Sequence, residues 1–409
     1  MYERMKNLLG GGAKHTLSSD MLIDCVQKRS LSELGDALRI YVLHDPSDIR
    51  KPSSQDMEYL GKVKGLNKAV INGYKSANCV AIDPTNQGVS LLCHELYSEN
   101  HPNYISQKRL ADSENLTAVE QELVSNGKHV NSQVLVLRQI TESSALLKKD
   151  SPNRQVTHIL DREFDDSTIF RAISALKDEF VVRAILSRVS SEGETKLTPK
   201  TGRVSKQLHY PKLVDKSLKF QASYFIPKLT IKNKTYSGVT AMLEWEDLVI
   251  EEKTYKVVKI TLKQGEKALF QHHMLLITNR KVETAEDAKN VYHAYILRFK
   301  IEVVFKFIKQ NLGWESFQIR NFEAIKNLLA LAFFLVAYFK ELEDELKKHD
   351  LALFLCKLAH SKGKISIFFL LLGLEKLAHF QEVQKWMTEN DISPQQISDM
   401  LQEAGLLQT

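Results

Sequence analysis

The sequence contains few cysteines, and their placement excludes two kinds of site. Cys25, Cys79, Cys93 and Cys356 are widely scattered along 409 residues. A structural zinc site, or the disulfide framework of a secreted protein, needs cysteines at close and regular spacing. Because no such spacing occurs, we expect the chain to reside in a reducing cytoplasm.

The sequence also lacks a secretory signal and a long apolar run. Residues 1–14 contain glycine and basic residues but no apolar central stretch, so no cleavable signal is predicted. The longest apolar run, residues 327–339, lies between Lys326 and Lys340 and falls short of the roughly 20 residues that a membrane-spanning helix needs. We therefore expect a buried core helix there and no association with a membrane.

Neither sign of charge dominates. Lysine and arginine total 56 against 50 acidic residues, which gives a formal net charge of +6. This balance suits a polyanionic partner such as nucleic acid but does not require one. The hydrophobic share of 43% and the charged share of 26% are typical of soluble globular proteins. The length predicts about two to four structural units.

The pattern of apolar residues changes along the chain. Residues 1–75 read as short helical pieces broken at His44-Asp45-Pro46, and we interpret them as a helical, DNA-binding N-terminal region. Residues 76–189 alternate apolar strands with helices, which is typical of an α/β core. Residues 190–270 contain strands separated by turn residues, which predicts a β-rich insertion. From residue 271 a buried strand returns, and the rest is almost wholly helical.

Two aspartates directly follow apolar strands. Asp83 comes after residues 79–82, and Asp161 comes after residues 155–160. A carboxylate at the rim of a sheet can reach both solvent and a metal ion. Aspartate also commonly caps turns, and for these two residues alone turn capping is the simpler interpretation.

A predicted helix near residue 300 carries a third acid among cations. At roughly 100° per residue, one face carries Tyr295, Arg298, Glu302, Lys306 and Lys309 within an arc of roughly 80°. The opposite face carries the apolar residues 303, 304, 307 and 308, which we expect to be buried. A solvated amphipathic helix with ion pairs four residues apart is the alternative.

Together these acids form a candidate metal site. Carboxylates from adjacent strands and a helix can hold two divalent cations, because hard oxygen ligands suit Mg²⁺ and Mn²⁺. Two such ions roughly 4 Å apart would activate a water or a DNA 3′-hydroxyl and stabilise the leaving oxygen. The hypothesis is that Asp83, Asp161 and Glu302 are the catalytic metal ligands. Cations beside Glu302 would then hold backbone phosphates.

The spacing of these residues resembles a family signature. Tyr295-x2-Arg298-x3-Glu302-x6-Lys309 is similar to the Tyr-Arg-Glu-Lys signature of bacterial insertion-sequence transposases, specifically the insertion sequence four family that includes the kanamycin-resistance transposon's enzyme. Upstream, residues 161–165 read Asp-Arg-Glu-Phe-Asp and are similar to the family's Asp-Arg-Glu-Ala-Asp segment, with Phe164 as the departure. Asp83 sits where the family's first catalytic aspartate would be, in the weakest of the three motifs.

The resemblance covers about residues 78–345 and implies a fold. It implies an α/β protein whose ribonuclease-H-like catalytic core is formed by residues 76–189 and 271–345. The β-rich insertion at residues 190–270 would fill the long gap between Asp161 and Glu302. Helical regions at residues 1–75 and 346–409 would flank this core, the latter helping two subunits to pair.

The resemblance also implies a reaction and partners. The enzyme would cleave double-stranded DNA at terminal inverted repeats through a hairpin intermediate and transfer the strand into target DNA, as a homodimer on DNA. Tyr295, Arg298, Lys306 and Lys309 would contact that DNA. The setting would be the bacterial cytoplasm, at the nucleoid. Two alternatives remain: a ribonuclease-H-like nuclease that never joins DNA, and a domesticated relative that binds DNA without cutting it.

Two further features carry weaker hypotheses. Residues 196–219 are rich in lysine and arginine and could follow a DNA backbone, or could form a solvated loop. His272-His273 suggests metal binding, but neighbouring residues in a strand point to opposite faces and cannot readily chelate one ion. A structural or DNA-facing role is the preferred interpretation of this pair.

Overall fold

The computed structural model describes residues 18–85, 88–149, 151–190, 194–200, 203–231, 234–348, 351–361 and 367–403. The chain divides into two compact units, residues 1–334 and residues 335–409. Asp83, Asp161 and Glu302 all belong to the first unit.

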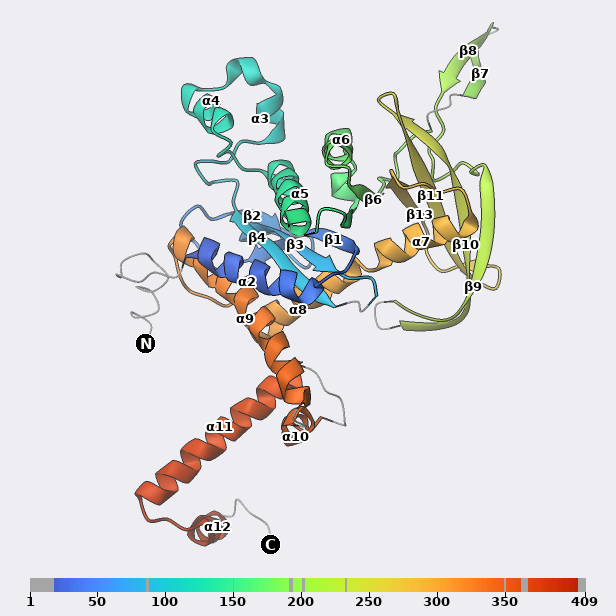
Figure 1. Cartoon of the computed structure of the whole chain (residues 1–409). Helices are drawn as coiled ribbons and strands as arrows, with labels where there is room; N and C mark the ends of the chain where they lie inside the picture. The colour runs from blue at the N-terminus through green and yellow to red at the C-terminus, as the bar shows by residue number, and fades with distance from the viewer. Residues whose placement is uncertain are drawn as a thin grey trace. The chain divides into compact units, whose positions relative to one another are not determined.

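The first unit is built on one large mixed sheet (Figure 1). Its strand order is β2-β3-β1-β5-β6-β13-β11-β10-β9, with β4 beside β3 and β12 beside β11. β1, β5 and β6 are parallel to one another, and the other neighbours are antiparallel. In chain order the strands are β1 (Arg39–Arg50), β2 (Gly61–Lys64), β3 (Val70–Ile82), β4 (Val89–Tyr97), β5 (Gln155–Leu160), β6 (Glu179–Arg183), β9 (Phe220–Ile231), β10 (Lys234–Ile250), β11 (Lys253–Gln264), β12 (Lys267–Ala268) and β13 (Met274–Thr278).

The N-terminal region is not wholly helical, which corrects the sequence-based expectation for residues 1–75. Within its described part only α2 (Ser19–Leu34) is a helix, and β1, β2 and the start of β3 belong to the sheet. Pro46, interpreted as a helix break, lies inside β1 opposite Ala77. A proline is tolerated there because β1 pairs with β5 only as far as Leu43, so the following residues have a partner strand on one side alone.

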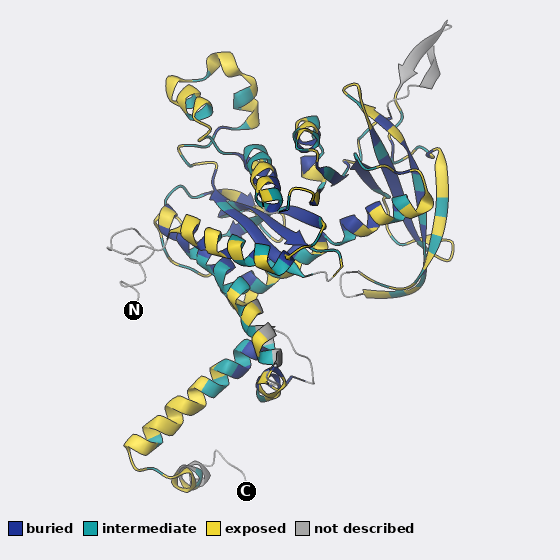
Figure 2. Ribbon diagram, viewed as in Figure 1, coloured by how far each residue is buried: buried dark blue, intermediate teal, exposed yellow. Residues whose placement is uncertain are grey.

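Helices cover both faces of the central strands. Figure 1 shows α5 (Ser132–Lys149) and α6 (Ser167–Ala175) on one face, and α8 (Phe299–Asn311) and α9 (Phe322–Lys348) on the other. Figure 2 shows that these strands are buried. One core cluster joins α2, β1, β3, β4, β5 and α5 through side chains that include Leu34, Ile40, Val42, Ala81 and Leu147.

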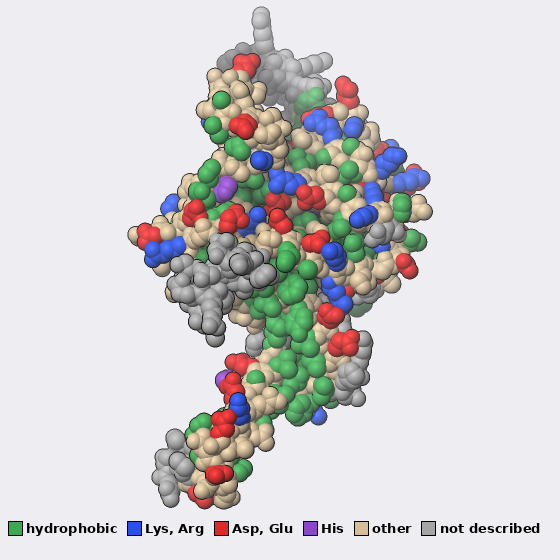
Figure 3. Space-filling view, turned by 60° about the vertical axis from the view of Figure 1, so that its left-hand side comes forward, with side chains coloured by type: hydrophobic (Ala, Val, Ile, Leu, Met, Phe, Trp, Pro, Cys, Tyr) green, Lys and Arg blue, Asp and Glu red, His purple; other side chains and the backbone are tan. Residues whose placement is uncertain are grey.

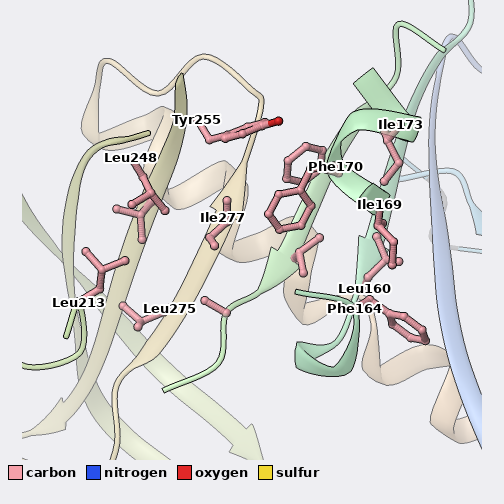
Figure 4. Close-up of a cluster of buried hydrophobic side chains, with 14 of the residues drawn as sticks. Leu160, Phe164, Ile169, Phe170, Ile173, Leu213, Leu248, Tyr255, Leu275 and Ile277 are labelled. Atoms are coloured by element: carbon pink, nitrogen blue, oxygen red, sulfur yellow. The ribbon is translucent and has the colours of Figure 1, made fainter. Parts of the chain in front are cut away.

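A second core cluster joins the end of β5 to the β-rich segment (Figure 4). Leu160 on β5 shares it with Ile277 on β13, and the rings of Phe170 and Phe180 stack with their centroids 4.8 Å apart. Tyr255 on β11 meets both rings. The described residues of the segment 190–270 are rich in strands, and β9, β10 and β11 continue the same sheet.

Further elements lie outside these layers. α3 (Gln107–Ala111) and α4 (Ala118–Ser125) lead to α5, and a hairpin of β7 (Glu194–Lys200) and β8 (Arg203–His209) opens the β-rich segment. This hairpin falls in the basic stretch 196–219, of which residues 201 and 202 lie outside the described residues.

Residues 322–339 of α9 are the one described segment that is long and apolar enough to cross a membrane by length and composition. A core helix of a soluble protein passes the same test. Here Ile325, Leu329 and Phe333 are all buried within the first unit. The expectation of a buried core helix over residues 327–339 therefore holds for the first part of that run, whereas Tyr338 in its last part is 50% exposed.

The second unit is helical. It holds α10 (Leu351–Leu358), α11 (Ile367–Glu389) and α12 (Pro394–Glu403), together with the end of α9. A small core forms around Leu355, Cys356 and Leu370. Large hydrophobic side chains remain exposed on α11, notably Phe380 and Trp386. Figure 3 shows hydrophobic side chains gathered on one face of the molecule.

Candidate functional site

The parallel pairing of β1 and β5 brings two aspartates side by side. Leu43 is the register partner of Ile159. Asp45 and Asp161 each follow two residues later along their own strand, so their backbones reach the same edge of the sheet. Asp45 projects to the face opposite that of His44, because neighbouring residues of a strand alternate between faces.

Glu302 comes from a helix that begins beside these strands. The expected single helix around residue 300 is two helices, α7 (Ala285–Ile296) and α8. At the joint, Arg298 N–H donates to the carbonyl of Tyr295 at 3.0 Å and Ile301 N–H donates to that of Arg298 at 3.1 Å. Such i to i−3 bonds form a tight 3₁₀ turn, a feature that often marks a functional hinge.

The break changes which residues are buried, and this corrects the expected faces. Tyr295 and Arg298 are 0% and 6% exposed, so they do not project into solvent. Val303, expected in the core, is 66% exposed. The buried stripe of α8 is formed by Ile301, Phe305 and Ile308 instead. Of the four apolar residues expected to be buried, only Ile308 is.

Arg298 is the hub that connects the three acids. Its guanidinium nitrogens lie 2.8 Å from Asp45 Oδ1, 2.9 Å from Glu302 Oε1 and 3.9 Å from Asp161 Oδ2. The Arg298 side chain is 7% exposed. Tyr295 Oη donates a hydrogen bond of 3.1 Å to Asp161 Oδ1. Five side chains from β1, the end of β5, α7, α8 and the joint between these two helices thus form one polar cluster.

The cluster is rich in negative charge. Burial raises the pKa of Asp45 to about 7; the Arg298 charge opposes this shift, while Glu302, Asp161 and Glu163 add to it. Burial likewise raises the pKa of Tyr295 to about 12, and the charge of Asp161 adds to the shift. One guanidinium does not balance this concentration of carboxylates. The cluster is therefore suited to binding a cation, and Arg298 takes that position in this structure.

Asp83 is not part of this cluster, and its expected place there is corrected. Asp45 pairs with Asn78 across β1 and β3, whereas Asp83 follows Ile82, the partner of Tyr41. Asp83 thus lies beyond one end of the paired segment, five residues along the chain from Asn78 and about 16 Å away at roughly 3.3 Å per residue. Its Oδ1 accepts a hydrogen bond of 2.8 Å from Thr85 N–H. It caps a turn, as the simpler interpretation proposed.

Asp45 is the site residue that sequence reasoning missed. A signal was available, because residues 40–43 form an apolar run directly before His44-Asp45. This is the same strand-end pattern that identified Asp161. Reading His44-Asp45-Pro46 as a break between helices concealed it.

The two lysines of the expected DNA-binding face differ in their surroundings. Lys306 is exposed on α8. Lys309 Nζ donates to the backbone carbonyl of Asp48 at 2.7 Å and lies 3.5 Å from Glu315 Oε1. Burial lowers the pKa of Lys309. In this structure Lys309 holds α8 against β1.

The His272-His273 pair lies in a bend before β13, so the alternation of a strand does not apply to it. Both histidines line a pocket of about 590 Å³, together with Arg162 and Lys212. His273 Nδ1 is 2.7 Å from Thr261 Oγ1, and burial lowers the pKa of His273.

Within the described part of the chain, no three His, Cys, Asp or Glu side chains are already assembled for a metal ion. At the acidic cluster the guanidinium of Arg298 lies between the acids and bonds two of them. The donor set itself fits a divalent ion, because it consists of hard carboxylate oxygens around one cation.

Comparison with known protein families gives a match. A family model described as the transposase DDE domain matches residues 123–339, which is more than half of the chain. No curated protein matches the sequence. The matched segment contains Asp161, Arg298 and Glu302 but begins after both Asp45 and Asp83. The choice between Asp45 and Asp83 as the first acid therefore depends on the geometry of the structure and not on the family match.

Proposed function

Since the chain belongs to the family of transposases with a DDE domain, we propose that it cuts DNA at the ends of an insertion sequence and joins those ends to target DNA. The observation that carries this proposal is the convergence of Asp45, Asp161 and Glu302 on one cation, Arg298. In this proposal Asp45 replaces Asp83 as the first of the three catalytic acids.

The proposal includes a ribonuclease-H-like catalytic core. It is supported by the strand order β4-β3-β1-β5-β6, in which the first three strands are antiparallel and the last three parallel. It is also supported by the position of the β-rich segment, which follows β6 and precedes the Glu302 helix. The Tyr295 to Lys309 spacing favours membership of the insertion sequence four family.

Asp45, Asp161 and Glu302 would hold two Mg²⁺ or Mn²⁺ ions. When bound, such ions activate the attacking water or 3′-hydroxyl and stabilise the leaving oxygen of a phosphodiester. The protein's own part is to hold the three carboxylates on rigid elements: two adjacent parallel strands and the first turn of α8. Tyr295 supports Asp161 through its hydrogen bond of 3.1 Å.

Tyr295, Arg298, Lys306 and Lys309 would contact the DNA. Lys306 is exposed and can reach a backbone phosphate directly, and such contacts position a duplex without reading its sequence. The other three side chains make internal contacts in the DNA-free protein. Their engagement with DNA therefore requires a local rearrangement, at the α7–α8 joint for Tyr295 and Arg298 and at the end of α8 for Lys309.

A homodimer on DNA is the proposed assembly. The exposed Phe380, Val383 and Trp386 of α11 support it, since clustered hydrophobic side chains at a surface commonly mark a protein interface. The proposed activity involves no membrane.

The test is incubation of the purified protein with Mg²⁺ or Mn²⁺ and duplexes that carry the terminal sequences flanking its gene. Denaturing and native gels should show nicks, then hairpin ends, then products joined to a second DNA. Nicks without hairpins or joined products would indicate a nuclease. Binding without nicks would indicate a domesticated relative, and either result would overturn the proposal.

A further inference from the structure

A cation of the protein itself lies among the proposed metal ligands. The Arg298 guanidinium bonds Asp45 Oδ1 and Glu302 Oε1 at 2.8 and 2.9 Å and lies 3.9 Å from Asp161 Oδ2. The side chains of Arg298 and Asp45 are only 7% and 15% exposed. The side chains of Asp161 and Glu302 are 26% and 49% exposed. Without a cation between them, the three carboxylates that Arg298 now joins would repel one another.

We propose that Arg298 is a placeholder for the metal ions: it holds the three carboxylates together in the DNA-free protein and moves away when DNA and metal bind. The inference rests on the proposed function, because it assumes that these carboxylates are the metal ligands. It also specifies the order of binding: a DNA phosphate binds the guanidinium first, and the carboxylates are then free to bind metal.

Arg298 and a metal ion cannot both occupy the space between the three carboxylates, for geometric reasons. Mg²⁺ requires ligand oxygens at about 2.0–2.1 Å in an octahedral arrangement. The same oxygens of Asp45 and Glu302 now accept hydrogen bonds from guanidinium nitrogens. A second positive charge between these groups would also be repelled by the first.

The structure contains features that suit such a movement. Arg298 stands at the α7–α8 joint, where i to i−3 bonds replace the regular helical ones. Its Nε is buried and has no hydrogen-bond partner among the described residues. A buried donor without an acceptor is costly. A DNA phosphate, with several acceptor oxygens suited to a guanidinium, can satisfy more of these donors than the present arrangement does.

The consequence is coupling between DNA and metal. If DNA removes Arg298 from the acids, DNA raises the affinity for metal, and by reciprocity metal raises the affinity for DNA. The protein then carries few metal ions until its substrate arrives. This limits cutting of DNA that fails to engage Arg298.

The experiment measures Mn²⁺ binding directly, by electron paramagnetic resonance of the free ion, with and without end duplex. In the wild type, DNA should tighten Mn²⁺ binding by about tenfold or more. Arg298→Gln should bind Mn²⁺ about tenfold more tightly without DNA, and added DNA should change this by less than about threefold. Arg298→Lys retains the charge and should stay closer to the wild type.

Lys289→Gln is the matched control, because it removes one positive charge from α7 at an exposed ion pair with Glu286. It should leave Mn²⁺ binding unchanged. If Arg298→Gln is unstable without metal, its melting temperature must rise more on Mn²⁺ addition than that of the wild type.

The outcomes separate the two proposals. Mn²⁺ binding that Asp161→Asn abolishes, but that Arg298→Gln does not strengthen, overturns the placeholder and leaves the metal site intact. If no variant shows Mn²⁺ binding that Asp161→Asn weakens, the proposed function itself is overturned.

Discussion

Exchanging one carboxylate for an amide at two positions distinguishes Asp45 from Asp83. Asp45→Asn removes a charged oxygen that bonds Arg298 at 2.8 Å in the acidic cluster. Asp83→Asn retains the oxygen that accepts from Thr85 N–H. We expect the first substitution to abolish DNA cleavage and the second to leave it unchanged.

The magnitudes follow from the surroundings of each residue. Metal ions supply several kcal/mol of charge stabilisation, so losing about 4 kcal/mol through one ligand lowers the cleavage rate roughly 10³-fold. Removing one partner of a buried ion pair costs about 3–5 kcal/mol of stability. Asp45→Asn should cost less, about 1–2 kcal/mol, because Glu302 still pairs with Arg298 and the burial of Asp45 is itself unfavourable. Asp83→Asn should change stability by less than about 0.5 kcal/mol.

The assay is single-turnover cleavage of a labelled end duplex in Mg²⁺, followed on denaturing gels. Circular dichroism melts establish that both variants are folded at the assay temperature. An inactive Asp83→Asn protein beside an active Asp45→Asn protein would refute the assignment of the first acid.

Phe170→Ala, which empties the cluster shared with Phe180 and Tyr255, should cost about 3–5 kcal/mol in urea unfolding, whereas Val303→Ala at an exposed position should cost less than about 0.5 kcal/mol. Burial, and to a lesser degree the Lys326 charge, lower the pKa of His94 to about 3 in the folded protein. As the pH falls, His94 is therefore protonated in the unfolded chain before it is protonated in the folded protein. Stability should fall as the pH drops from about 6.5 towards 3. In His94→Asn the melting temperature should fall less between pH 7 and 4.5, because asparagine does not titrate, and its amide can still donate to Asn78. An unchanged slope would show that His94 is not the source of the pH dependence. Trp386→Ser should weaken pairing of subunits on end DNA, measured by light scattering, while leaving the melting temperature of the first unit unchanged.

Local patterns in the sequence predicted part of the fold. The apolar runs before Asp161 and in residues 274–278 are the strands β5 and β13, and the β-rich segment lies where turn residues separate apolar runs. These features depend on neighbours along the chain. The sequence can therefore reveal them without knowledge of the tertiary structure.

The missed features depend on contacts between distant residues. Asp45 lies beside Asp161 only because β1 pairs with β5. The pairing of residues 43 and 159 produces no recognisable pattern in the sequence around either residue. The break between α7 and α8 falls at Leu297-Arg298, where neither glycine nor proline announces it. The burial of Arg298 likewise follows from acids on three separate elements. Residue spacing placed Tyr295, Arg298 and Glu302 together but did not predict the direction in which their side chains point.

The continuity of the sheet has a mechanical consequence. Because β13 and β11 are hydrogen-bonded through β6 to β5, the strands β9 and β10 cannot swing independently of Asp161. The stacked rings of Phe170 and Phe180 brace this connection from the side. The strands β9 and β10 would therefore keep a fixed distance from Asp161, and a change in their position would have to move the whole sheet.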